Sequence, residues 1–174
     1  VLITGAGPIG LMSVAICKFV GARNVVITDI NEYRLNLARK MGATKAINIS
    51  KHSISEFYSE INMTSGFDVG LEMSGNSEAL SSMLKHMYHG GNIALLGLLP
   101  ETTQVNWDDI IFKGLNVKGI YGREMYETWY KMTQMIRSGL DISKVLTHKF
   151  DINQYKIAFE IMEAGNCGKV VLKW

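Results

Sequence analysis

The sequence predicts an α/β protein built on a doubly wound parallel sheet of six strands, with helices on both faces. Apolar runs of strand length alternate with amphipathic stretches of helical spacing through most of the chain. This alternation is typical of a parallel sheet, because each right-handed crossover between parallel strands needs a helix to return the chain. The runs are largely apolar, which fits a sheet that is buried on both faces.

The expected elements follow one another in a regular order. Strands are expected at residues 1–4, 25–28, 46–49, 67–71, 92–96 and 117–121. Helices are expected at residues 9–20 and 32–41, and helical spacing recurs at residues 55–61 and 78–88. Later in the chain come a helix at residues 126–137, a strand at 145–150, a helix at 153–164 and a strand at 169–172. The sequence therefore predicts a sheet domain, residues 1–122, and a C-terminal α/β segment, residues 123–174.

Composition narrows the class of protein. The 174 residues suffice for one well-buried domain and are few for two. A net charge of +2, with both signs interspersed, gives no basis for binding nucleic acid or an acidic membrane. Two widely separated cysteines favour reduced thiols in the cytoplasm over a disulfide framework. The chain begins with Val1 inside a predicted buried strand, so we expect it to be a piece of a longer polypeptide.

The glycine-rich stretch at residues 5–10 carries the strongest functional signal. It lies between a predicted strand and a predicted helix, which is where dinucleotide-binding Rossmann domains have their phosphate turn. Gly5 permits the tight turn, Gly7 has no Cβ to obstruct a pyrophosphate, and Gly10 lets the helix pack on the strand. Pro8 falls in the first helical turn, where its missing N–H costs nothing. Free N–H groups and the helix dipole would then face the phosphates.

An acidic residue ends the second predicted strand. Asp29 stands 19 residues beyond Gly10, close to the interval of ~20 expected for the acid that accepts from the adenosine ribose hydroxyls. Its charge would repel the extra phosphate of NADP, so the sequence predicts NAD as the cofactor. Arg34 could receive a 2′-phosphate, cover the ribose and adenine, or be an ordinary solvated helix residue.

Later strand ends are further candidates, since ligands of open α/β sheets bind beyond the carboxyl ends of the strands. Residues 72–75 end one strand and include the hydroxyl of Ser74 and the flexible Gly75, residues 96–100 end another, and residues 120–122 end a third. Each is equally compatible with an ordinary strand-to-loop turn. We identify no catalytic residue and no metal ligands, because no histidine, cysteine or hydroxyl group stands in a recognisable spacing.

Several stretches carry a family resemblance. Residues 5–10, 25–29 and 31–34 resemble the cofactor domain of zinc-dependent medium-chain alcohol dehydrogenases. Residues 66–75, 111–114, 118–132 and 168–172 are similar, within that family, to the bacterial L-threonine 3-dehydrogenases. The resemblance runs the whole length of the chain.

The resemblance implies oxidation of the 3-hydroxyl of L-threonine to 2-amino-3-oxobutyrate, with hydride transfer to NAD. It places the zinc ligands and proton-relay residues in an N-terminal domain, so this chain alone would bind NAD without catalysis. The C-terminal segment would pack on that domain, and the strand at residues 117–121 would pair with its copy in a dimer within a tetramer. The expected cofactor contacts are Gly5, Gly7, Pro8, Ile9, Gly10, Asp29, Arg34, Ser74, Gly75, Leu96, Gly97, Leu98, Ile120 and Tyr121.

Three alternatives remain open at this point. The chain could belong to another medium-chain dehydrogenase that acts on a polyol or secondary alcohol. It could instead be an NAD-sensing regulatory module, although no basic helix supports a DNA-binding partner. The chain could also be monomeric and prone to aggregation through its apolar edge strand.

Overall fold

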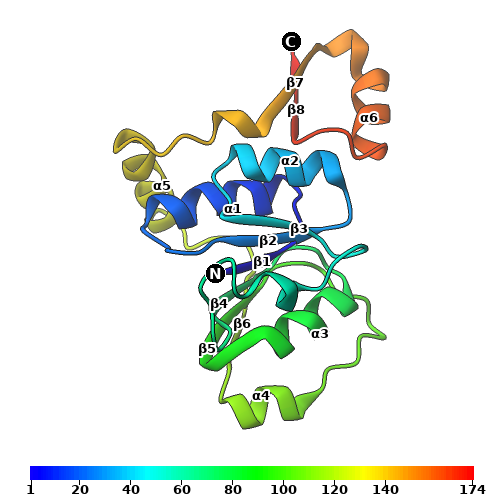
Figure 1. The fold of residues 1–174 in the computed structure, drawn as a ribbon. Helices are drawn as coiled ribbons and strands as arrows, with labels where there is room; N and C mark the ends of the chain where they lie inside the picture. Colours follow the sequence, from blue (N-terminus) through cyan, green and yellow to red (C-terminus); the bar gives the residue numbers. More distant parts are fainter.

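A computed structural model describes all residues from 1 to 174. Six parallel strands form one sheet in the order β3-β2-β1-β4-β5-β6 (Figure 1). The strands are β1 (Leu2–Thr4), β2 (Val26–Asp29), β3 (Lys45–Asn48), β4 (Phe67–Glu72), β5 (Met87–Leu95) and β6 (Asn116–Gly119). The order reverses at β1, so the switch point where ligands of such sheets bind lies between β1 and β4.

Helices cover both faces of this sheet. The helices α1 (Pro8–Phe19) and α2 (Glu32–Lys40) lie on one face, and α3 (Ser77–His86) and α4 (Trp107–Lys113) lie on the other (Figure 1). Successive strand residues enter opposite cores: Leu2 belongs to the α3 side, whereas Ile3 belongs to the α1 side. Both side chains are fully buried. The largely apolar strands of the sequence are thus explained by a sheet with no solvent-exposed face at its centre.

Local sequence sets the helix boundaries near the switch point. Helix α1 begins with Pro8, whose missing N–H would have no intrahelical partner there. The side chain of Asn31 caps α2 by accepting from the N–H of Arg34 at 3.2 Å. Asn76 caps α3 in the same way. Each of these helices therefore begins directly beyond the carboxyl end of a strand.

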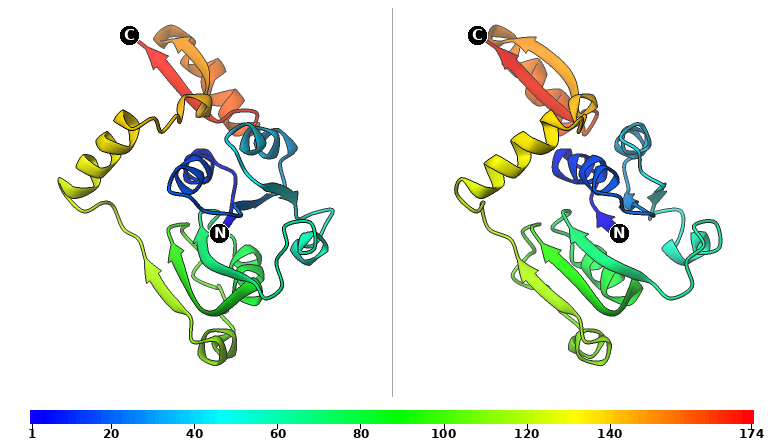
Figure 2. Two further views of the ribbon diagram at one scale, coloured as in Figure 1. Left: turned by 60° about the vertical axis from the view of Figure 1, so that its left-hand side comes forward. Right: turned by 90° about the vertical axis from the view of Figure 1, so that its left-hand side faces the viewer.

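The C-terminal segment adds a separate small sheet. It contains α5 (Glu127–Arg137), β7 (Leu146–Asp151), α6 (Tyr155–Glu163) and β8 (Lys169–Lys173), and β7 pairs with β8 in parallel. It lies on the α1 and α2 side, away from α3 and α4 (Figure 2). Leu140 and Val145 belong to the same core as Ile3, and Lys144 Nζ donates to Lys40 O at 3.1 Å. The segment is therefore anchored to the sheet domain through the α1 and α2 layer.

The predicted fold class is confirmed, and the differences are local. Residues 55–61, expected to be helical, form only a 3-10 turn at Ile54–Phe57 followed by turns. Helix α4 was not expected. None of its residues is buried, so its sequence lacks the helical spacing of apolar residues that a buried face requires. Strand β6 ends at Gly119 rather than at residue 121. No helix of the structure has the length and apolar character needed to cross a bilayer.

The six-stranded sheet and the two-stranded sheet differ in burial, so their backbone amides should differ in protection from hydrogen exchange. Strand β1 is fully buried and has a partner on each side, whereas β7 and β8 pair only with each other and alternate with exposed positions. We expect backbone amides in β7 and β8 to exchange with deuterium at least about tenfold faster than those in β1, a difference of ~1.4 kcal/mol in opening free energy. Equal protection of the two regions would contradict this view of the C-terminal segment.

Candidate dinucleotide-binding site

The turn after β1 is shaped by two glycines that have no room for side chains. Gly5 has φ +89°, and a Cβ there would lie 2.9 Å from the Cα of Ser74. Its N–H donates to Thr28 O at 2.8 Å, which ties the turn to β2. A Cβ on Gly10 would overlap the carbonyl oxygen of Gly5. The roles expected for Gly5 and Gly10 thus have a direct steric basis in the contact between turn, strand and helix.

Gly7 is different, because nothing within the chain requires a glycine there. Its φ is −67°, a value that any residue adopts, and a Cβ would meet no atom within 4 Å. Gly7 is the N-cap of α1, and no side chain caps this helix. The positive end of a 12-residue helix therefore faces open space beside a residue without a side chain. This geometry fits a phosphate group that approaches the backbone closely.

Asp29 holds the glycine turn from the end of β2. Its Oδ2 accepts from the N–H of Ala6 at 2.6 Å, and its Oδ1 accepts from the N–H groups of Ile30 and Asn31 at 2.8 and 2.9 Å. A carboxylate has about four acceptor positions, so one position on Oδ2 stays free for a hydroxyl. The residue that was expected to bind the ribose therefore also sets the distance between the glycine turn and the loop after β2.

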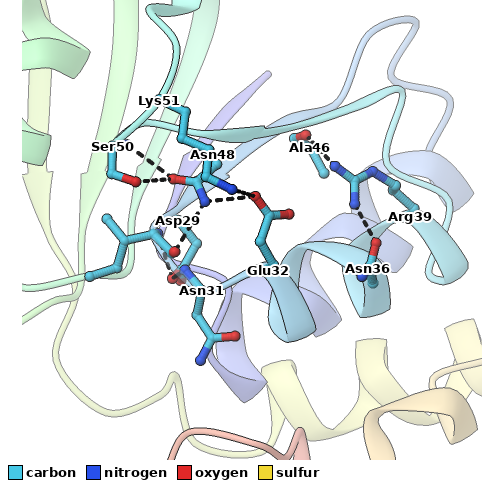
Figure 3. A network of polar contacts seen from close by, with 10 residues as sticks. Asp29, Asn31, Glu32, Asn36, Arg39, Ala46, Asn48, Ser50 and Lys51 are labelled. Atoms are coloured by element: carbon cyan, nitrogen blue, oxygen red, sulfur yellow. Dashed lines mark hydrogen bonds and ion pairs between the residues drawn. The ribbon is translucent and has the colours of Figure 1, made fainter.

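A polar network continues from Asp29 towards β3 (Figure 3). Asn48 is nearly buried and donates to Ile30 O at 3.2 Å and to Glu32 Oε1 at 2.7 Å. Lys51 Nζ lies 3.1 Å from the same oxygen of Glu32. Hydrogen bonds from Asn48 and then from Lys51 lower the pKa of the Glu32 carboxyl. The network fixes the loops after β2 and β3 beside Asp29.

Arg34 lies beside the C-terminal segment. No hydrogen bond or ion pair engages its guanidinium, and its Nε is buried without a partner. A Cβ on Gly165 would lie 3.6 Å from Arg34 Nη2 and 2.9 Å from Asn31 Nδ2, and Asn31 donates to Gly165 O at 3.1 Å. The loop between α6 and β8 therefore packs on the Asn31–Arg34 end of the site. An unpaired buried N–H is costly, so Arg34 has capacity for an acceptor from outside the chain.

The loops after β4 and β5 pack against each other and against the glycine turn. A Cβ on Gly75 would lie 2.7 Å from Leu98 O, and a Cβ on Gly97 would lie 2.8 Å from the Cα of Gly75. With the contact between Gly5 and Ser74, the structure brings five of the predicted residues together at the switch point. Leu96 lies in the same loop, and its N–H donates to Glu72 O at 3.0 Å.

The remaining predicted residues are more peripheral. Ile9 is half exposed in the first turn of α1. The N–H of Ile120 donates to Leu95 O at 2.8 Å, which continues the pairing of β6 with β5. Tyr121 is fully exposed and stands outside the packed loops. Tyr121 lies two residues beyond the end of β6, and its role as a cofactor contact stays a prediction.

Sequence reasoning missed one residue at the centre of this site. Glu72, the last residue of β4, has no exposed surface and accepts hydrogen bonds from Thr4, Ser74 and Gly75. The sequence did contain a signal, namely an acid at the end of a strand that is otherwise expected to be buried. A buried acid requires hydrogen-bond partners, so such a residue is a candidate for holding neighbouring loops.

The chain itself does not fit a zinc site. No group of three or more His, Cys, Asp or Glu side chains converges anywhere in residues 1–174, and Cys17 and Cys167 are both free. Zinc sites need three or four such ligands around one point. We therefore derive no step of the chemistry through a metal held by these residues.

Comparison with known proteins agrees with this geometry. The sequence profile of the family described as zinc-binding dehydrogenase matches residues 8–138. L-threonine 3-dehydrogenases of Paraburkholderia phytofirmans and Burkholderia mallei are 62% and 60% identical to the chain over all 174 residues. The chain spans about half the length of these curated relatives, 51% in each case.

Solved structures give the same result at the level of the fold. An alcohol dehydrogenase of Escherichia coli, determined with its cofactor NADH, superimposes with a TM-score of 0.86 at 26% identity. The match covers 99% of this chain and 51% of that one. An alcohol dehydrogenase of Thermotoga maritima superimposes with a TM-score of 0.84 at 29% identity, covering 98% of this chain and 48% of that one. With a family profile that matches three quarters of its residues, the chain belongs to the zinc-binding dehydrogenase family.

Proposed function

We propose that this chain binds NAD and forms the cofactor-binding half of an L-threonine 3-dehydrogenase. The proposal rests on Gly7, which lies at the N-terminus of α1, where no side chain caps the helix. No steric contact within the chain requires a glycine at this position. It stands next to Ala6, which Asp29 holds in place. These residues provide a pyrophosphate site and a ribose acceptor side by side, as a dinucleotide requires.

The pyrophosphate of NAD would bind along the turn formed by Gly5, Gly7 and Gly10. Pro8 and Ile9 occupy the first turn of the helix, whose free N–H groups and dipole favour an anion. Because a Cβ on Gly7 would project into open space, the backbone alone sets the closest approach of the phosphates. This is the property that a phosphate turn needs and that a turn with only a structural role does not.

Selectivity for NAD over NADP rests on the charges at the end of β2. Asp29 retains one free acceptor position for the ribose hydroxyls, and Glu32 adds a second carboxylate nearby (Figure 3). Asp29 would repel a 2′-phosphate, whereas the charge of Glu32 is offset by its ion pair with Lys51. Arg34, held against Gly165, would cover the adenosine end. We favour this role over binding a 2′-phosphate, because the carboxylate of Asp29 occupies the ribose position.

The nicotinamide end would lie over the loops after β4, β5 and β6. Ser74, residues 96–98 and residues 120–121 surround the carboxyl edge of those strands. Their exposed backbone groups would orient the carboxamide and thereby the face of the ring. Bound NAD would supply the hydride acceptor, and this chain would position it without itself activating an alcohol.

The substrate assignment comes from the relatives. Two curated L-threonine 3-dehydrogenases share 60–62% identity with the chain along its whole length. We propose that the protein to which this chain belongs oxidises L-threonine, with the zinc-dependent chemistry supplied outside these residues. Exposed apolar residues of the C-terminal segment, including Trp129, Tyr130 and Phe159, would then be covered by the catalytic domain. This arrangement also accounts for residues 123–174 as a segment that connects the two domains.

The affinity for NAD and NADP tests the cofactor assignment. We expect calorimetric titration of the chain to show binding of NAD with a clear preference over NADP. The Asp29→Asn variant should weaken NAD binding by about tenfold and narrow the preference, since a hydrogen bond to a charged group contributes about 1.5–3 kcal/mol. Glu160→Gln, an exposed acid on α6 outside the proposed site, is the matched control and should change NAD affinity by less than about threefold. A preference for NADP would contradict the role given to Asp29.

We further propose that β6 mediates assembly into a dimer, within a tetramer of the whole protein. Strand β6 is an edge strand with β5 as its only neighbour. Next to it, α4 has no buried residue and exposes Trp107, Ile111 and Phe112 by 66%, 68% and 77%. An apolar edge of this kind needs a cover, and a second copy related by a twofold axis would supply one.

Sedimentation equilibrium tests this assembly. The chain should sediment as a dimer at micromolar concentration, and Phe112→Lys should shift it to a monomer because a charge would be buried in the interface. Val20→Lys, at a 66% exposed apolar residue that caps the C-terminus of α1, should leave the dimer intact. A monomeric chain, or a dimer that tolerates Phe112→Lys, would contradict the proposal.

A further inference from the structure

We propose that Glu72 is a positioning residue that fixes the three loops at the switch point relative to one another. The three loops follow β1, β4 and β5, and the cofactor would span them. The inference rests on the proposed NAD-binding function of the same site. It concerns a residue that would not touch the cofactor itself, because its side chain is fully buried beneath the loops.

The side chain is an isolated buried acid. None of the four ion pairs of the chain includes Glu72, although its exposed surface is 0%. Burying a carboxylate without a cation is unfavourable unless hydrogen bonds replace those of water. Donors of Thr4, Ser74 and Gly75 supply these bonds, so the charge is held by groups of the switch point itself and not by a counter-ion. The position of the carboxylate therefore sets the positions of these donors.

The hydrogen bonds of the carboxylate reach two different loops. Oε1 accepts from Thr4 Oγ1 at 3.3 Å, at the end of β1 directly before the glycine turn. The same oxygen accepts from the N–H and the hydroxyl of Ser74 and from the N–H of Gly75 at 3.0 Å. One oxygen thus joins the start of the pyrophosphate turn to the loop after β4.

The third loop is fixed by contact. The N–H groups of Leu96 and Gly97 both donate to Glu72 O at 3.0 Å, and a Cβ on Gly97 would overlap Glu72 Oε2. These two N–H groups bond to the backbone carbonyl of Glu72, and only the backbone of Gly97 lies against the carboxylate itself. A shift of the carboxylate would therefore act on this loop through Gly97.

This geometry predicts an uneven effect along the cofactor. The adenosine end would bind at Asp29, whose hydrogen bonds go to Ala6, Ile30 and Asn31 and not to the loops after β4 and β5. The nicotinamide half would contact those two loops, which Glu72 holds. A change at Glu72 should therefore weaken the binding of NAD, which spans all the loops, much more than the binding of AMP, which lacks the nicotinamide half.

Glu72→Gln is the main test variant, because it keeps Oε1 as an acceptor and replaces Oε2 by an amide donor facing the N–H of Gly75. We expect NAD to bind about tenfold more weakly, the effect of one uncompensated buried polar contact, while AMP affinity changes by less than about twofold. Ser74→Ala, which removes one donor, should give a smaller change in the same direction. Asn48→Ala is the matched control at the adenosine end. It should lower the affinities for NAD and for AMP by the same factor.

Amide hydrogen exchange of the ligand-free chain provides a readout that does not depend on the cofactor. Glu72→Gln should speed exchange at both Gly75 and Gly97, which lie in different loops, while the amides of β2 keep their protection. If the affinities for NAD and AMP fall equally and the amides of β2 also lose protection from exchange, Glu72 has only a stabilising role. The proposal is then overturned. It is also overturned if Gly97 exchange and the ratio of the two affinities stay unchanged. If NAD fails to bind the unaltered chain but both loops loosen in the variant, the proposed function fails while the linkage of the loops stands.

Discussion

At the carboxyl edge of the sheet, the backbones of neighbouring loops lie so close together that they leave no room for side chains at the contact points. Gly5 lies against Ser74, Gly75 against Leu98, and Gly97 against Glu72. Such contacts leave N–H groups in need of acceptors, and two carboxylates supply them. Asp29 serves the glycine turn from the side of β2, and the Glu72 carboxylate serves Thr4 and the loop after β4, while the backbone carbonyl of Glu72 accepts from the loop after β5. Steric closeness and buried acceptors together create a rigid rim at the switch point.

This rim gives the fold its capacity to hold a dinucleotide. Within it, Gly7 alone among the turn glycines meets nothing inside the chain, so its lack of a side chain is explained by a partner from outside. The exposed faces of α4, β6 and the C-terminal segment fit the same picture. They include exposed apolar side chains such as Phe112, Val117 and Trp129, and the curated relatives are about twice as long as this chain. The cofactor half is thus well ordered around its own site and incompletely covered elsewhere.

Local patterns predicted most of the fold and part of the site. The glycine spacing and the interval to Asp29 are short-range signals that follow directly from the strand–turn–helix–strand unit, and the structure places these residues together. Glu72 was missed because its partners are set by topology: Thr4 is 68 positions away, and only the adjacency of β1 and β4 brings them together. The contact of Arg34 with Gly165 was missed for the same reason. Helix α4 was missed because an exposed helix has no buried face to impose a period.

If Gly7 is a glycine because a pyrophosphate binds against it, a substitution at Gly7 should affect cofactor binding without affecting stability, and a pair of variants separates the two effects. Gly7→Asn places a good N-cap residue with a permitted φ in open space, so the unfolding free energy should change by less than about 0.5 kcal/mol. Its NAD affinity should nevertheless fall by at least about tenfold, because the side chain occupies the place of the phosphates. Gly10→Ala, which overlaps Gly5 O, should instead lose about 1–3 kcal/mol of stability. Unchanged NAD binding by a stable Gly7→Asn chain would contradict the account.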